Sequence, residues 1–62
     1  MNGLQKATLK AKYENLRAAY AELTTYAYNE LNLDLDCIDA ILDMEETLIS
    51  AGALDEDYIY EG

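Results

Sequence analysis

The stretch Leu33–Glu46 reads LDLDCIDAILDMEE and places six carboxylates among large aliphatic side chains. At 100° per residue of an α-helix, four of these acids fall within about 80° of one another. They are Asp36, Asp39, Asp43 and Glu46. The aliphatic residues of the segment form two further lines on the helix: Cys37, Ile41, Met44 and Leu48, and beside them Ile38, Leu42 and Ile49. This period predicts a helix over residues 36–51 with one anionic and one apolar face.

Two residues of this helix are unusual for their positions. Glu45 alone interrupts the apolar half, and an antiparallel neighbour would bring it near Tyr20 and Leu23. One interpretation is a partly buried carboxylate that accepts a hydrogen bond from a tyrosine or pairs with a base. The other is an exposed edge that meets a basic partner. We expect Cys37, the only cysteine, to be a small buried hydrophobic residue.

An earlier helix is predicted over residues 4–31. Asn2 followed three residues later by Gln5 is a capping-box pattern, and no Pro or Gly lies between Leu4 and Ala51. The apolar positions advance in steps of three or four residues, close to a heptad repeat. They are Leu9, Tyr13, Leu16, Tyr20, Leu23, Ala27 and Leu31. Such a stripe is typical of a bundle helix, whether its partner lies in the same chain or in another.

The segment NELNLDL, residues 29–35, predicts the turn between the two helices. Asn32 can adopt the left-handed conformation that ends a helix, and Asp34 or Asp36 can cap the next one. Because the connection is short, we expect the helices to pack antiparallel. Gly52 predicts the end of the second helix.

The residues 53–62, ALDEDYIYEG, mix apolar side chains with four acids. Asp55 can cap one more helical turn, or Tyr58-Ile59-Tyr60 can form an extended segment; we favour a short helical turn folded back on the hairpin. The predicted fold is therefore an all-α antiparallel helical hairpin with a short C-terminal turn or helix, in a single domain of residues 1–62. One hairpin cannot cover both apolar stripes, so we also expect a homodimer resembling a four-helix bundle, unless the C-terminal segment closes the core.

Charge is distributed unevenly along the chain. The net charge is −9, from 4 bases and 13 acids, and residues 18–62 hold all the acids except Glu14 and none of the bases. This part would repel phosphates, so we expect no direct binding of nucleic acid and no binding to an anionic membrane. Lys6, Lys10 and Arg17 lie along one flank of the first helix. They either neutralise acids of the neighbouring helix or form a binding surface of their own.

The residue types argue against most kinds of chemistry. With one Cys and no His, no metal site of the zinc type is expected. The acids between Asp34 and Glu45 approach the spacing of a calcium loop, but Ile38 and Asp39 occupy positions that need a ligand and a glycine. We expect no enzyme and no cofactor, because the sequence offers neither a nucleophile–base pair nor a glycine-rich phosphate loop. With no apolar run of membrane-spanning length and no signal core, we expect a cytoplasmic protein.

An acidic helix with tyrosines nearby suggests a binding function. We expect an inhibitor that occupies a basic, nucleic-acid-binding surface of a partner protein, in the manner of a DNA mimic. The carboxylates would attract the partner, and tyrosines would supply contact area at a low entropy cost. The predicted contact residues are Asp36, Asp39, Asp43, Glu46, Asp55, Glu56, Asp57, Tyr58 and Tyr60.

In size and acidity the chain resembles the small helical proteins that phages direct against host enzymes and defence systems, anti-CRISPR proteins among them. This resemblance is one of composition and assigns no functional residue. The alternative function is a homodimeric adaptor or structural protein whose acidic face is merely solvated. The absence of any base over residues 18–62 favours the mimic, because a surface selected only for solubility usually mixes both signs.

Overall fold

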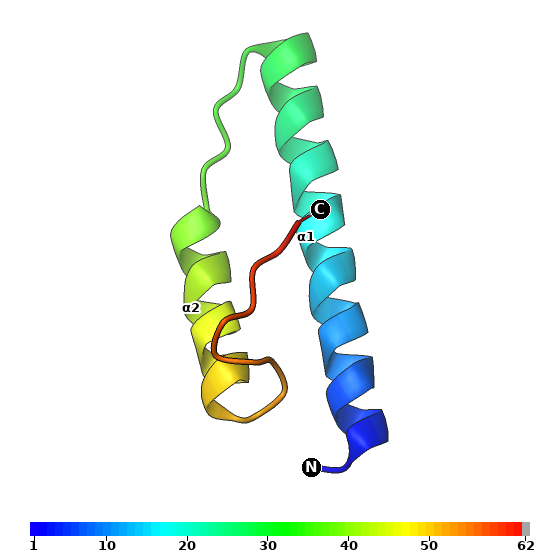
Figure 1. Ribbon diagram of the computed structural model, residues 1–62. Helices are drawn as coiled ribbons and strands as arrows, with labels where there is room; N and C mark the ends of the chain where they lie inside the picture. The colour runs from blue at the N-terminus through cyan, green and yellow to red at the C-terminus, as the bar shows by residue number, and fades with distance from the viewer. Residues whose placement is uncertain (62) are drawn as a thin grey trace.

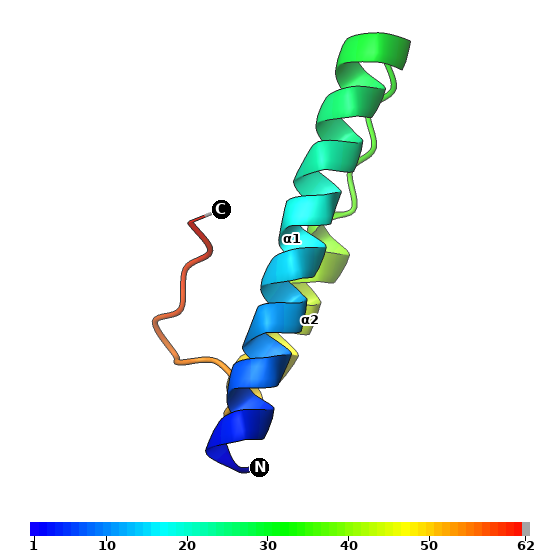
Figure 2. The ribbon, with the colours of Figure 1, turned by 90° about the vertical axis from the view of Figure 1, so that its right-hand side faces the viewer.

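The protein, seen in a computed structural model that describes residues 1–61, contains two helices, α1 (Gly3–Leu31) and α2 (Ile38–Ser50). The helices lie side by side and run in opposite directions, joined by residues 32–37 (Figure 1). The residues after α2 turn back and lie along one side of the pair (Figure 2). The all-α prediction is confirmed, since no strand occurs among the described residues.

Local sequence signals determine both ends of α1. The Asn2 side chain accepts a hydrogen bond from the Gln5 N–H at 2.7 Å, and the Gln5 side chain accepts one from the Asn2 N–H at 3.0 Å. This capping box satisfies two N–H groups that the first turn cannot. At the other end, Asn32 has φ 54° and ψ 35°, a left-handed conformation that asparagine tolerates. Both features were predicted, and the helix is one residue longer than expected.

The start of α2 was predicted two residues too early. The Asp36 carboxylate accepts the Ile38 N–H at 3.2 Å, and the Tyr20 hydroxyl accepts the Cys37 N–H at 3.2 Å. Because these two N–H groups are satisfied by side chains, residues 36 and 37 can stay outside the helix. The predicted burial of Cys37 is also wrong: the residue precedes α2 and is exposed.

The end of α2 is a glycine stop of the expected kind. Gly52 has φ 85°, a conformation that costs glycine little. The Gly52 N–H donates to the Ile49 carbonyl at 3.0 Å and the Ala53 N–H donates to the Leu48 carbonyl at 2.9 Å. This pair of bonds is the Schellman pattern that closes a helix, and it turns the chain back toward α1.

The favoured third helical turn does not form in the described part of the chain. Residues 51–57 make turns, and residues 58–61 are irregular. Tertiary contacts decide this outcome, because Leu54 is 5% exposed and packs with Tyr13 and Ile41 as the core. Burial of these apolar side chains stabilises the folded-back segment more than one isolated helical turn could.

The predicted apolar stripe of α1 is only partly covered. Tyr13 and Ala27 are buried, whereas Leu16, Leu23 and Leu31 are exposed. Leu16 and Leu23 lie on an open side of the hairpin, next to Ile41 and Met44 of α2. Leu31 is exposed because α2 is shorter than α1. The first residues of α2 lie beside Tyr20, as the Tyr20–Cys37 hydrogen bond shows, and α2 then runs back toward the start of α1 (Figure 1). The last part of α1 therefore has only the connection beside it.

Substitution of Leu54 tests whether the C-terminal segment completes the core. Leu54→Ala should lower the free energy of unfolding by about 2–4 kcal/mol, through lost burial and a residual cavity. Urea denaturation followed by circular dichroism measures this change. Ile59→Ala is the matched control, because Ile59 is 76% exposed and its truncation should change stability by less than about 0.5 kcal/mol. Equal effects of the two variants would contradict the observed packing.

Candidate functional site

The four predicted acids of the second helix remain on its outer side. Asp39, Asp43 and Glu46 are exposed along α2, and Asp36 is exposed just before it. Asp36 has a structural task as well, since one of its oxygens accepts the Ile38 N–H. Helical periodicity places Asp39, Asp43 and Glu46 on one face of α2, whereas Asp36 lies outside the helix and the predicted stripe is one residue shorter.

The three acids of the C-terminal turn are also exposed. Asp55, Glu56 and Asp57 follow the glycine stop, and their turn lies next to the end of α2 (Figure 1). The turn is held by a hydrogen bond from the Tyr58 N–H to the Asp55 carbonyl at 3.0 Å. The backbone of this acidic turn is therefore fixed, while its side chains face solvent.

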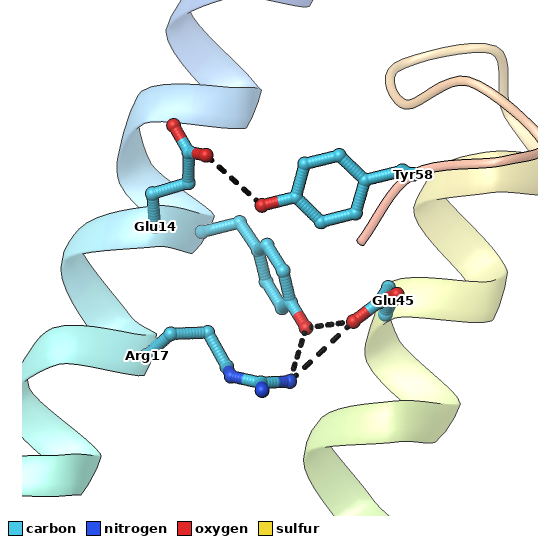
Figure 3. Close-up of polar contacts among 5 residues, drawn as sticks. Glu14, Arg17, Glu45 and Tyr58 are labelled. Carbon is cyan, nitrogen blue, oxygen red and sulfur yellow. Dashed lines mark hydrogen bonds and ion pairs between the residues drawn. The ribbon is translucent and has the colours of Figure 1, made fainter. Parts of the chain in front are cut away.

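The two predicted tyrosine anchors make contacts inside the protein. The Tyr58 hydroxyl donates to the Glu14 carboxylate at 3.0 Å (Figure 3), and its ring meets the Tyr13 ring edge-on with 6.1 Å between centroids. Tyr60 lies against the Arg17 guanidinium, 4.7 Å from the ring centroid. Glu14 could not be predicted as a partner of Tyr58, because no local pattern links positions 44 residues apart.

Glu45 is the centre of a polar cluster between the helices (Figure 3). The Tyr13 hydroxyl donates to Glu45 Oε2 at 2.5 Å, and Arg17 Nη1 lies 3.4 Å from the same oxygen and 3.1 Å from the Tyr13 hydroxyl. The side chains of Arg17 and Glu45 are only 20% and 14% exposed. This arrangement confirms the interpretation of Glu45 as a partly buried carboxylate bound by a tyrosine and a base.

The expected neighbours of Glu45 were wrong by about two helical turns. The carboxylate meets Tyr13 and Arg17, whereas a tight hairpin would have placed it near Tyr20 and Leu23. Residues 32–37 form no helix, and an extended connection advances the chain about 3.3 Å per residue. That length carries α2 further back along α1 before its first turn begins.

The environment shifts the acidity of two tyrosines. Burial raises the pKa of Tyr13, and its hydrogen bond to Glu45 acts in the same direction, while Arg17 opposes both. Burial also raises the pKa of Tyr58, with the hydrogen bond to Glu14 adding to it, to about 12. In each case a phenolate would lose its hydration and face a carboxylate. Both hydroxyls therefore stay protonated donors at neutral pH.

The outer acids have no base to neutralise them. Within residues 1–61 the sole ion pair joins Arg17 to Glu45, so the strongest base of the chain is used between the helices. Lys10 lies over the Tyr58 ring, 5.7 Å from its centroid. The neutralising role predicted for the basic flank thus holds for Arg17, and it concerns an inner carboxylate. The exposed carboxylates of α2 and of the acidic turn remain uncompensated.

An apolar groove of about 350 Å³ runs along the hairpin. Its lining is Leu16, Ala19, Tyr20, Leu23, Cys37, Ala40, Ile41 and Met44. On α1, Leu16 and Leu23 lie about 160–180° around the helix from Glu14, which contacts the C-terminal segment. One face of the hairpin is thus covered by that segment (Figure 2), and the groove lies on the other. Sequence periodicity identified an excess of apolar surface without showing which side stays open.

No family model, curated protein or solved structure matches the chain. In the described part of the chain, no three thiol or carboxylate groups lie close enough to hold a metal ion. None of the helices described is long and apolar enough to cross a membrane. Function is therefore inferred from the exposed carboxylates, the groove and the polar cluster themselves.

Removal of the Tyr13 hydroxyl tests the polar cluster. Tyr13→Phe leaves Glu45 with one partner fewer in a partly buried site, so the free energy of unfolding should fall by about 1–2 kcal/mol. Chemical denaturation provides the measurement. Tyr28→Phe is the matched control, because Tyr28 is 63% exposed and the loss of its hydroxyl should be nearly neutral. A Tyr13→Phe protein as stable as the control would show that the cluster contributes nothing.

The raised tyrosine pKa values predict loss of stability in alkali. Since the ordinary value is 10.0 and the folded Tyr58 has a pKa of about 12, its contribution is complete below pH 10. It is then lost as the pH rises toward 12, because the unfolded chain releases the proton first. Thermal unfolding at stepped pH values, with tyrosinate absorbance recorded in parallel, measures this loss. In Tyr58→Phe the decline should be shallower, and an unchanged slope would contradict the assignment.

Proposed function

We propose that the protein binds a basic, nucleic-acid-binding surface of a partner protein and blocks it by occupying that surface. The observation that carries this proposal is the uncompensated acidic face. Asp39, Asp43 and Glu46 are exposed, and none of them takes part in the one ion pair among the described residues, which joins Arg17 to Glu45. The proposed activity is binding without catalysis.

The spacing of the acids supports mimicry of a nucleic acid backbone. Carboxylates three or four residues apart on a helix repeat about every 4.5–6 Å along its axis. Phosphates on one DNA strand repeat about every 3.4 Å. The two linear charge densities are similar enough for the helix face to compete for a groove lined with lysine and arginine.

Carboxylates have the main role in the proposed binding. Tyr58 and Tyr60 are half-buried and already bound to Glu14 and Arg17, which leaves little of either ring for a partner. The acids on α2 supply the attraction, and those of the turn at residues 55–57 extend the charged surface beyond the helix.

We also propose that the chain associates as a homodimer resembling a four-helix bundle. The apolar groove supports this assembly, because contiguous exposed apolar surface in a small protein usually marks a contact. The same groove favours the second candidate function, a homodimeric adaptor whose acids are only solvated. The two functions differ in whether the acidic face itself is needed for binding.

Charge reversal on α2 tests the proposed function. The double variant Asp39→Lys with Asp43→Lys should keep the fold, since both side chains are exposed, and should lose its partners. Proteins captured from a cell lysate by the wild type should be nucleic-acid-binding proteins that excess duplex DNA releases. Their association should weaken steeply as salt rises, because exposed charges are screened beyond about 8 Å at physiological ionic strength.

The matched control reverses two exposed acids away from that face, Asp34→Lys with Glu61→Lys. Both double variants change the net charge from −9 by the same four units, so a simple loss of net charge would affect them equally. Capture that survives in the control and fails in the α2 variant supports the mimic. Capture that is unchanged in both, with the same salt dependence, favours the adaptor.

A further inference from the structure

A second line of side chains runs along α1 beside the groove. Its members advance by four and three residues in alternation and fall within about 80° of one another on the helix. They are Lys12, Leu16, Ala19, Leu23, Tyr26 and Glu30, here called the outer stripe. All six are exposed, and the large ones substantially so, at 40% for Leu16, 57% for Leu23 and 62% for Tyr26.

The outer stripe is complementary to its own reverse. A base at one end corresponds to an acid at the other, and apolar residues fill the positions between. Reversing it about Ala21 superimposes Lys12 on Glu30, Leu16 on Tyr26, and Ala19 on Leu23. Such a stripe is complementary to an antiparallel copy of itself, which is the condition for a two-fold symmetric interface.

We infer that a second copy of the chain docks antiparallel on the outer stripe, with the two-fold axis passing near Ala21. In this arrangement Lys12 of each chain lies opposite Glu30 of the other, and each Ala19 lies opposite a Leu23. The steps of four and three are those of knobs-into-holes packing, and small residues opposite large ones let two helices approach closely. The inference rests on the homodimer proposed above and specifies its contact face and register.

Charge decides the direction of the two helices. In a parallel pair, Lys12 would face Lys12 and Glu30 would face Glu30, and like charges at an interface disfavour binding. Neither residue has an ion-pair partner among residues 1–61, where Arg17 and Glu45 form the one pair. Both are therefore available to a second chain.

The proposed docking face on α1 does not overlap the face that the C-terminal segment already covers. The C-terminal segment contacts the other side of α1, at Lys10, Glu14 and Arg17. The groove beside the outer stripe shares Leu16, Ala19 and Leu23 with it, so the second copy would cover the groove as well. Asp39, Asp43 and Glu46 lie elsewhere on α2 and would stay exposed on both copies.

Charge reversal at the ends of the stripe tests the register. Lys12→Glu alone and Glu30→Lys alone each replace two attractive pairs by two repulsive ones, and should raise the dimer dissociation constant about tenfold. Mixing the two single variants should restore association at the wild-type level, because every contact then joins an acid to a base. Combining both changes in one chain should restore it too. Sedimentation equilibrium at micromolar concentration measures each mixture.

Two controls separate this register from general electrostatics and from misfolding. Lys6→Glu and Glu56→Lys make equal and opposite changes of net charge outside the stripe, so mixing them should bring no gain in association. Leu23→Lys places a charge in the centre of the stripe and should abolish the dimer. The far-UV circular dichroism of Leu23→Lys should match that of the wild type, since Leu23 is exposed and absent from the core.

Two results would overturn the inference in distinguishable ways. A wild-type chain that sediments at 7.0 kDa would reject the homodimer together with this docking mode, while leaving the α2 capture experiment to decide the proposed function. A stable dimer that is indifferent to Lys12→Glu, Glu30→Lys and their mixture would retain the homodimer and reject the outer stripe as its interface.

Discussion

The contact between Tyr13 and Glu45 holds this small protein together. The Tyr13 ring is 3% exposed and packs with Ile41 and Leu54, while its hydroxyl donates to a carboxylate on α2. One side chain thus joins α1, α2 and the C-terminal segment. A carboxylate that loses much of its hydration normally destabilises a core. Here it is tolerated because the tyrosine and Arg17 replace the water that Glu45 gives up.

This arrangement separates two uses of acidic residues. Glu14 and Glu45 accept hydrogen bonds from tyrosines and face inward. The exposed acids of α2 and of the C-terminal turn make no such bonds with their carboxylates, and Asp36, which precedes α2, accepts a bond from the backbone N–H of Ile38. The chain therefore concentrates its structural electrostatics between the helices, where a low dielectric strengthens each contact. Its remaining negative charge lies outside, where it costs repulsion and favours a basic partner.

Local features of the structure could be predicted from the sequence, because their causes lie within a few residues. The capping box at Asn2, the left-handed Asn32 and the glycine stop at Gly52 are of this kind. The inner position of Glu45 was one of two interpretations, and its partners depended on the length of an extended connection. The start of α2 could not be predicted, since it depends on a hydroxyl 17 residues away. The course of residues 53–61 depends on burial against α1, which no local propensity reveals.

The unequal lengths of the helices have a consequence for local opening. Protection of backbone amides from hydrogen exchange depends on how much structure must open. Amides around Tyr13 are protected by the whole core, because opening there separates three segments at once. The last turn and a half of α1, residues 26–31, have only the connection beside them (Figure 1), so we expect this part of the helix to fray while the core stays intact. We therefore expect the single chain to open as one cooperative unit and one helical extension with a lower free energy of opening.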